Sequence, residues 1–115
     1  MLERNKKPIY YCRRLMPGDV GYVEEMELFA EPVLRYLNYK SVSGEATLET
    51  VGEVNGKNLI AKKVAGGDTY TENDRCYVNM KPPEEYDAFC HGADYRVASV
   101  LPVNRTVEVI LEKVV

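Results

Sequence analysis

The chain has 115 residues, a formal net charge of −3 and apolar residues at 45% of its positions, a composition typical of one soluble globular domain. Its apolar runs are too short for a membrane-spanning helix, and the stretch from Met1 to Lys7 lacks the apolar segment of a secretion signal. Three cysteines are too few for a disulfide framework and favour buried thiols in a reducing compartment; they are Cys12, Cys76 and Cys90.

The first part of the chain is predicted to contain three strands. Residues 7–16 and 20–30 are rich in strand-favouring side chains, and Pro17-Gly18-Asp19 between them is a strong turn signal, so the two segments are expected to form a hairpin. Pro32 has no backbone N–H to donate to a neighbouring strand. It is therefore expected at the start or edge of the third strand, residues 33–40.

A long acidic segment, residues 41–56, follows the third strand and contains few large apolar groups. Connections in small domains usually have about four to six residues, and much longer ones are mostly functional or disordered. Asn55-Gly56 near its end is the favoured pair for a two-residue hairpin turn. Such a turn would pair residues 47–54 with residues 57–63.

Four more strands are predicted, at residues 58–64, 75–80, 94–101 and 105–114. The last two are expected to form a hairpin across Pro102-Val103-Asn104, and apolar residues alternate with glutamates in the final one. Ile110 breaks this alternation and is expected to lie under a neighbouring segment. Short strands with regularly spaced turns indicate a small barrel or sandwich. We expect a mainly β fold, a single antiparallel β-barrel of six to seven strands over residues 1–115, with residues 41–56 as a long inserted loop.

Charge is distributed unevenly along the first third of the chain. Residues 1–14 contain one acid, Glu3, and five bases, Arg4, Lys6, Lys7, Arg13 and Arg14. Residues 15–31 contain no base and five acids, Asp19, Glu24, Glu25, Glu27 and Glu31. Two interpretations stay open: head-to-tail contact between copies of the molecule, or two paired strands whose solvent-facing side chains attract each other.

The sequence offers no clear catalytic or metal-binding constellation. Cys90 and His91 are adjacent, and neighbours on a strand point to opposite faces, so they are poorly placed to act as nucleophile and base. The potential soft ligands lack the close paired spacing of zinc sites; they are Cys12, Cys76, Cys90 and His91. No spacing forces together any two of the loop carboxylates Asp68, Glu72, Asp74 and Asp87. We therefore expect a protein that is not an enzyme and that uses no cofactor.

Binding of single-stranded nucleic acid is the alternative function. Small β-barrels bind single strands through stacking aromatic rings and a basic groove. The candidate side chains are Tyr10, Tyr11, Tyr36, Tyr39, Lys6, Lys7, Arg13 and Arg35. The negative net charge argues against this function, because neutralisation of phosphates dominates non-specific affinity.

Several short motifs stand in a characteristic order along the chain. They are Asn5-Lys6-Lys7-Pro8-Ile9-Tyr10-Tyr11, Phe29-Ala30-Glu31-Pro32-Val33, Ser43-Gly44-Glu45-Ala46 and Val51-Gly52, followed more loosely by Glu72-Asn73-Asp74, Tyr77-Val78 and Asp94-Tyr95-Arg96-Val97. With them the chain resembles, over nearly its whole length, a family of head–tail joining proteins of tailed phages and prophages, also called head-closure or stopper proteins. It departs from the family pattern at residues 61–64, where a more apolar strand is usual.

This resemblance implies a structural role. Proteins of that family are small β-barrels that assemble in the host cytoplasm into a ring, twelve-fold or six-fold, located in the neck of the virion. The ring joins the portal or adaptor protein to the tail terminator or tail tube protein. Packaged double-stranded DNA passes through it without sequence-specific contact, and no membrane is involved.

The resemblance also implies a role for the long segment, which in that family projects toward the central channel and helps to retain and release DNA. Carried over, this loop is residues 41–56, with the channel-facing residues Ser43, Gly44, Glu45, Glu49, Gly52, Glu53 and Gly56. Glutamates four residues apart would repel one another on a helix, and repeated around a ring they would present negative charge to DNA over about 10 Å. The glycines provide hinge points. The alternative is an acidic surface loop with no channel.

Overall fold

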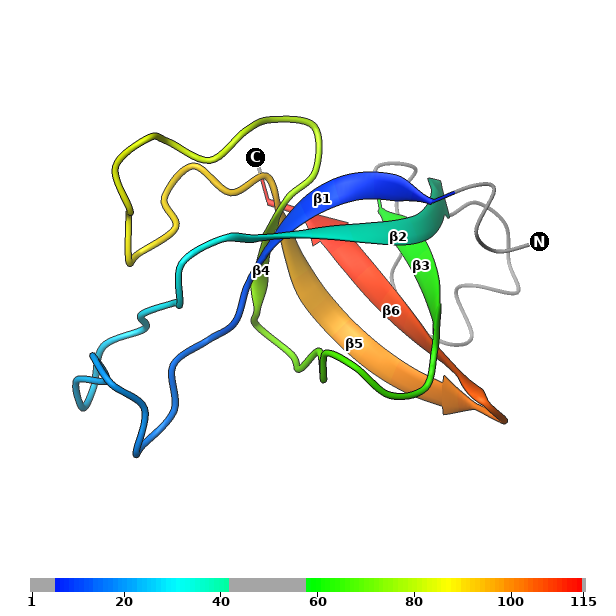
Figure 1. Ribbon diagram of the computed structural model, residues 1–115, viewed down its shortest axis with the longest axis horizontal. Helices are drawn as coiled ribbons and strands as arrows, with labels where there is room; N and C mark the ends of the chain where they lie inside the picture. Colours follow the sequence, from blue (N-terminus) through cyan, green and yellow to red (C-terminus); the bar gives the residue numbers. More distant parts are fainter. Residues whose placement is uncertain (1–5, 42–57, 115) are drawn as a thin grey trace.

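The computed structural model describes residues 6–41 and 58–114, and this part of the chain is all β, with no helix. Its strands are β1 (Lys7–Cys12), β2 (Val33–Ser41), β3 (Leu59–Val64), β4 (Arg75–Tyr77), β5 (Tyr95–Val103) and β6 (Thr106–Lys113). They close into one antiparallel barrel in the order β1-β2-β3-β6-β5-β4 (Figure 1). The predicted fold class is therefore confirmed, and the predicted inserted loop falls largely outside the described residues.

The hairpin predicted between residues 7–16 and 20–30 is wrong. β1 ends at Cys12 and pairs with β2 on one side and β4 on the other. Residues 13–32, which we call the arm, form an irregular loop whose two legs meet at a single bridge, Arg14 to Phe29. The arm cannot continue as a strand because Gly18, Gly21 and Glu25 take positive φ angles of 100°, 90° and 70°.

Strand β3 begins one residue after its predicted start, and in the barrel it lies between β2 and β6. Ser41 is paired with Leu59, and Leu59 is paired with Leu111 on the other side. Because β2 and β6 occupy both of its edges, β3 has no free edge for the hairpin predicted across Asn55-Gly56. That prediction is wrong for residues 59–62, whereas residues 47–54 lie outside the described part of the chain.

Strand β4 is shorter than predicted because a side chain takes over its hydrogen bonds. The amides of Val78 and Asn79 donate to the carboxylate of Asp94 at 2.8 and 2.9 Å, where a continued strand would use a backbone carbonyl. The final hairpin turns at Asn104, which has a φ of 56°, and Arg105, so Pro102 and Val103 belong to β5. The observed turn therefore begins two residues later than the turn predicted from the sequence.

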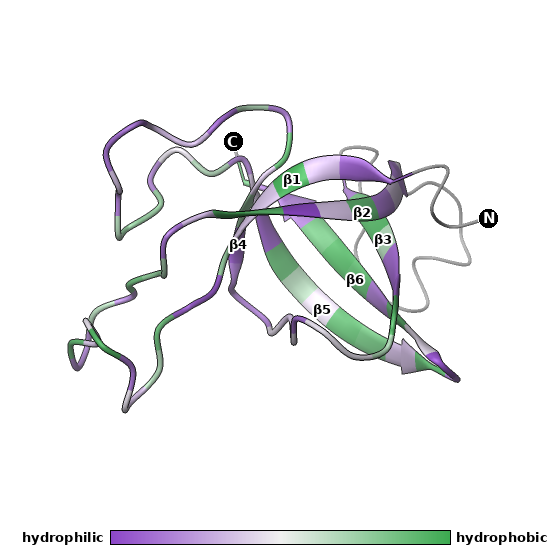
Figure 2. Ribbon diagram, in the orientation of Figure 1, coloured by the Kyte–Doolittle hydropathy of each residue, from purple (hydrophilic) through white to green (hydrophobic). Residues whose placement is uncertain are grey.

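Apolar side chains fill the barrel. The interior cluster consists of Ile9, Tyr11, Leu37, Leu59, Ala61, Tyr70, Cys76, Tyr95, Val97, Val109 and Leu111. Hydrophobic and hydrophilic bands alternate along the strands, as Figure 2 shows for β5 and β6. Ile110 points away from this cluster by its place in the alternation, yet only 1% of its surface is exposed, so the expectation that it is covered is confirmed.

Replacing Leu111 by alanine tests the barrel core. Leu111 is fully buried and pairs with both β3 and β5, so Leu111→Ala should lower the free energy of unfolding by about 2–5 kcal/mol. Val20→Ala is the control, because Val20 is 97% exposed and should change stability by less than about 0.5 kcal/mol. Urea unfolding followed by tyrosine fluorescence or circular dichroism measures both; equal effects would contradict this core assignment.

Candidate interaction surfaces

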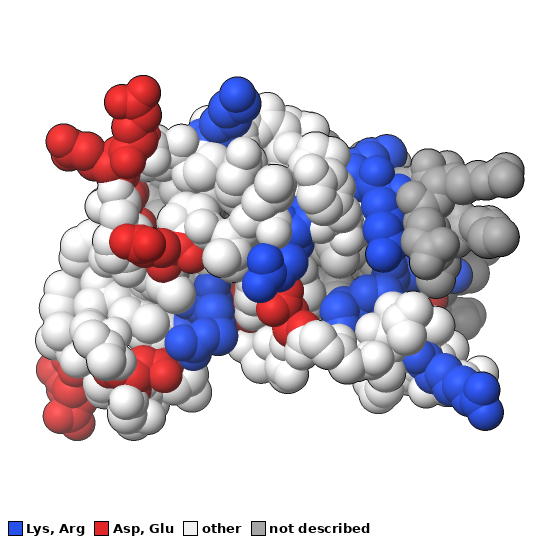
Figure 3. Space-filling model, in the orientation of Figure 1, with Lys and Arg blue, Asp and Glu red and all other residues white. Residues whose placement is uncertain are grey.

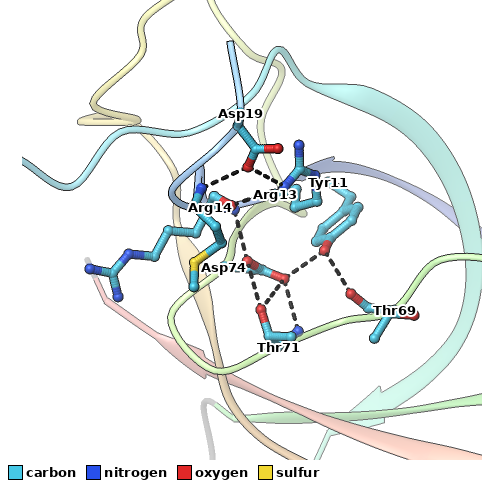
Figure 4. A network of polar contacts seen from close by, with 8 residues as sticks. Tyr11, Arg13, Arg14, Asp19, Thr69, Thr71 and Asp74 are labelled. Carbon is cyan, nitrogen blue, oxygen red and sulfur yellow. Dashed lines mark hydrogen bonds and ion pairs between the residues drawn. The ribbon is translucent and has the colours of Figure 1, made fainter. Parts of the chain in front are cut away.

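A buried carboxylate, Asp74, holds the base of the arm to the barrel (Figure 4). Its side chain is fully buried and accepts hydrogen bonds from the Tyr11 hydroxyl at 2.6 Å, the Arg14 amide at 2.9 Å and the Thr71 amide at 2.9 Å. The Thr71 hydroxyl donates to it as well, at 3.2 Å. Burial, and then the bond to Asp74, raises the pKa of Tyr11 far above its usual value, so this hydroxyl stays a donor. Asp74 thereby joins β1, the turn before β4 and the first residues of the arm.

Backbone bonds then fix the two legs of the arm to each other. The Leu15 amide donates to the Leu28 carbonyl at 2.8 Å, and the Ala30 amide donates to the Arg13 carbonyl at 2.7 Å. Asp19 closes the first turn, accepting from the Met16 amide at 2.7 Å and pairing with the Arg13 guanidinium at 2.9 Å. The hydrogen bond from Arg13, and then the bond from the Met16 amide, hold the pKa of Asp19 below its usual value. The arm is therefore an ordered projection.

A second apolar cluster joins the arm to the loop of residues 78–94. It consists of Cys12, Phe29, Tyr77, Cys90 and Ala93. The Phe29 amide donates to the Ala88 carbonyl at 2.8 Å, and the Tyr86 hydroxyl donates to the Phe29 carbonyl. All three thiols of the chain are free and buried, as predicted, and burial raises the pKa of Cys76 far above its usual value.

The arm and the 78–94 loop leave the barrel at the same end (Figure 1). Figure 3 shows acidic side chains toward this end and basic side chains toward the opposite one. The arm and the 78–94 loop carry the acids Asp19, Glu24, Glu25, Glu27, Glu31, Glu84 and Glu85 with the bases Arg13, Arg14 and Lys81, and the barrel carries the bases Lys7, Lys40, Lys62, Lys63 and Arg105 with the acids Glu108 and Glu112 among others. Because residues 20–30 are not a strand, the interpretation that this asymmetry reflects two paired strands is wrong.

The predicted channel-facing residues all fall outside the described part of the chain; they are Ser43, Gly44, Glu45, Glu49, Gly52, Glu53 and Gly56. The structure does describe where the segment departs and returns. Ser41 ends β2 and is paired with Leu59, the first residue of β3. Asn58, just before β3, is buried and accepts a hydrogen bond from the Lys113 amide at 3.4 Å. The segment therefore leaves and re-enters the barrel wall at neighbouring points.

The residues proposed for single-strand binding do not form one stacking surface. Tyr11 is buried against Asp74, and the Lys7 ammonium lies over the Tyr39 ring at 4.6 Å. Arg35 pairs with Asp68 at 2.5 Å, as Arg13 does with Asp19. Tyr10 is partly buried against the second cluster. Among the four tyrosines, Tyr36 is the most exposed, at 56%, and Lys6 is exposed as well.

The catalytic candidates are also separated. The His91 side chain is 79% exposed, lies 3.5 Å from Asp87 and stacks on Phe89, whereas Cys90 is buried. The sequence predicted that Cys90 and His91 would point apart, but the reason given was that they lie on a strand. Both residues lie in a loop, where Cys90 has a φ of 51°. Asp87 accepts hydrogen bonds from the His91 and Phe89 amides, and the first of these contributes most to lowering its pKa.

Of the other loop carboxylates, Asp68 pairs with Arg35, Asp74 is the buried acceptor described above, and Glu72 is exposed. Within residues 6–41 and 58–114, no group of three or more His, Cys, Asp or Glu side chains could hold a metal ion. The same residues contain no helix long and apolar enough to cross a membrane. Comparisons with protein-family models, with curated proteins and with solved structures gave no match to this chain.

Substitution of Asp74 should have a larger effect on stability than its place in a polar loop suggests. Asp74→Ala removes the acceptor of the Thr71 and Arg14 amides and leaves the buried Tyr11 hydroxyl with only the longer bond to the Thr69 carbonyl at 3.3 Å, so we expect a loss of about 3 kcal/mol. Tyr11→Phe removes one of these bonds and should cost about 1.5 kcal/mol. Glu72→Ala, two residues away and exposed, is the matched control. Urea unfolding gives all three values, and an Asp74→Ala effect no larger than the control would contradict the role of this carboxylate.

Proposed function

We propose that this chain is a structural head–tail connector of a tailed phage, a head-closure or stopper protein that forms a ring in the neck of the virion. The observation that carries the proposal is a closed β-barrel with a long acidic segment between two paired strands of its wall. The acidic segment leaves after Ser41 and returns at Leu59, and these two residues are paired. A barrel with a long acidic segment inserted between two paired wall strands suits a ring subunit whose wall packs against its neighbours and whose loop reaches the DNA path.

The motifs that resemble the connector family coincide with residues that hold this fold together. Phe29 lies in the second cluster, Asp74 is the buried acceptor at the base of the arm, and Asp94 ends β4 by accepting two amides. Shared residues with such roles are what a common architecture requires. They support a common fold, and the connector function follows as a proposal from that likeness.

Charge favours the same function over nucleic-acid binding. The long segment carries Glu45, Glu49 and Glu53, and repeated around a ring these would line a channel with negative charge. Such a lining repels the phosphate backbone, so that DNA passes without adhering, and salt shortens the range of the repulsion to about 10 Å at 0.1 M. The packaged DNA is then a passing cargo, and the partners that bind the ring are the portal or adaptor complex and the tail.

The test of the function is made in the phage or prophage genome that encodes the chain. We expect the gene to lie after the portal and capsid genes and before the tail genes, and the protein to be present in purified virions at the neck. Deletion of the gene should give capsids that fail to join tails, and expression of the native chain from a plasmid should restore joining. Normal tailed particles in the deletion strain would overturn the proposal, as would a neck without a ring of this protein.

The acidic segment has a test of its own. Replacing Glu45, Glu49 and Glu53 together by lysine should slow DNA ejection, because a basic lining attracts phosphates. The matched control replaces the same three residues by glutamine, which removes the repulsion without adding attraction and should change ejection less. Time-resolved DNA release from purified particles measures both. Ejection at the native rate in the lysine variant would contradict a position beside the DNA path.

A further inference from the structure

The tip of the arm exposes apolar side chains amid acids. Met16, Val20, Val23 and Met26 are 55%, 97%, 46% and 42% exposed. The adjacent Glu24, Glu25 and Glu27 are exposed as well, no base occurs between residues 15 and 31, and Glu27 lies 4.0 Å from the Arg75 guanidinium of β4. Beside them lies an open hollow of about 640 Å³, lined by Leu15, Asp19, Val20, Leu28, Glu31 and Tyr86 among others. Exposed apolar groups gathered on an ordered projection are typical of a surface that binds another protein.

A second exposed surface, on the barrel wall, has the opposite charge. Leu37 packs inside the barrel, so Leu34, Tyr36 and Lys40, which alternate with it along β2, point outward. Across the ladder, Pro8 is paired with Tyr36 and Lys62 with Asn38. We call Pro8, Leu34, Tyr36, Lys40 and Lys62 the outer patch. Leu34 and Tyr36 are 43% and 56% exposed, and both lysines are exposed; Lys62 also pairs with Glu108 of β6 at 3.7 Å, whereas Lys40 is paired in register with Ile60.

We propose that the arm of one copy docks on the outer patch of the next copy, with apolar groups against apolar groups and Glu24, Glu25 and Glu27 facing Lys40 and Lys62. The inference deepens the proposed function and rests on it in one respect, namely that the assembly closes as a ring. Two different surfaces of one molecule meet in this contact, and such a heterologous contact repeats until it closes a ring or extends as a filament.

Three features of the structure favour a second copy as the occupant. The arm is acidic and the outer patch carries lysines, so the two surfaces have opposite charge; Figure 3 shows more acidic side chains at the arm's end of the molecule and more basic ones toward the other end. At the outer patch, β2 is paired with β1 along residues 33–37 and with β3 along residues 38–41, so contact at this wall uses side chains. The arm is held at its base by Asp74 and by the two backbone bonds between its legs, so docking costs little ordering entropy. An acidic arm would repel nucleic acid and anionic membranes.

The experiment measures self-association of the full chain by sedimentation over a wide concentration range, at low and high salt. The native protein should associate, and more weakly at high salt, because screening shortens the electrostatic range from about 30 Å at 0.01 M to about 3 Å at 1 M. The arm variant Glu24→Lys/Glu25→Lys/Glu27→Lys and the patch variant Lys40→Glu/Lys62→Glu should each associate about tenfold or more weakly. An equimolar mixture of the two should associate again, because each charge reversal then meets its complement.

Matched controls separate this contact from general repulsion. Glu84→Lys/Glu85→Lys reverses exposed charges of the 78–94 loop at the same end of the molecule and should leave association unchanged. Val20→Ser should weaken association without changing the unfolding midpoint, since Val20 is almost fully exposed. A native chain that stays monomeric throughout, a loop variant that weakens association like the arm variant, or a mixture without recovery would each overturn the inference.

These results are independent of the particle experiments. A ring of this protein at the virion neck, together with unaltered association of the arm and patch variants, would leave the connector function intact and reject the contact. If the mixture of the two variants recovers association but the deletion strain makes normal tailed particles, the contact is supported and the connector function is rejected.

Discussion

The position of the Asp74 carboxylate constrains more of this structure than any other single group. It is fully buried, and it accepts from β1 through Tyr11, from the arm through Arg14 and from its own turn through Thr71. A buried carboxylate is tolerated only where several donors surround it, so these three segments must meet at one point. Because Arg14 lies two residues beyond the end of β1, this meeting point determines where the arm leaves the barrel.

The asymmetry of the molecule follows from that constraint. Once the arm starts beside the turn before β4, Phe29 near its other end can pack with Cys12 and Tyr77, and the 78–94 loop covers the same cluster. Two long connections thus occupy one end of the barrel, and most of their charged residues are acids. The charge separation between the ends of the barrel is therefore a product of topology, and it persists as long as the arm remains fixed at its base.

The sequence was sufficient for the fold class because apolar alternation and turn residues are local signals. It placed β2 and β3 within one residue of their observed ends, and it anticipated the burial of Ile110. It failed where a distant side chain replaces a backbone partner, as Asp94 does at the end of β4. It also failed for residues 20–30, whose composition is typical of a strand although Val20, Val23 and Met26 remain exposed.

Those failures bear on the candidate surfaces. The sequence alone does not tell whether an apolar residue in an acidic segment is buried, because its burial depends on the segment that packs against it. Since β1 pairs with β2 and not with the arm, Val20 and Met26 remain exposed. In the sequence, the segment after Ser41 was the long connection that drew a functional prediction, because residues 20–30 of the arm were predicted to be a strand. Once the arm is recognised as an irregular segment, the sequence contains two long acidic segments, the arm and the segment after Ser41. The segment after Ser41 starts beside the Ser41–Leu59 pair, and we propose it for the DNA path; the arm is held at its base, and we propose it for contact with a neighbouring copy.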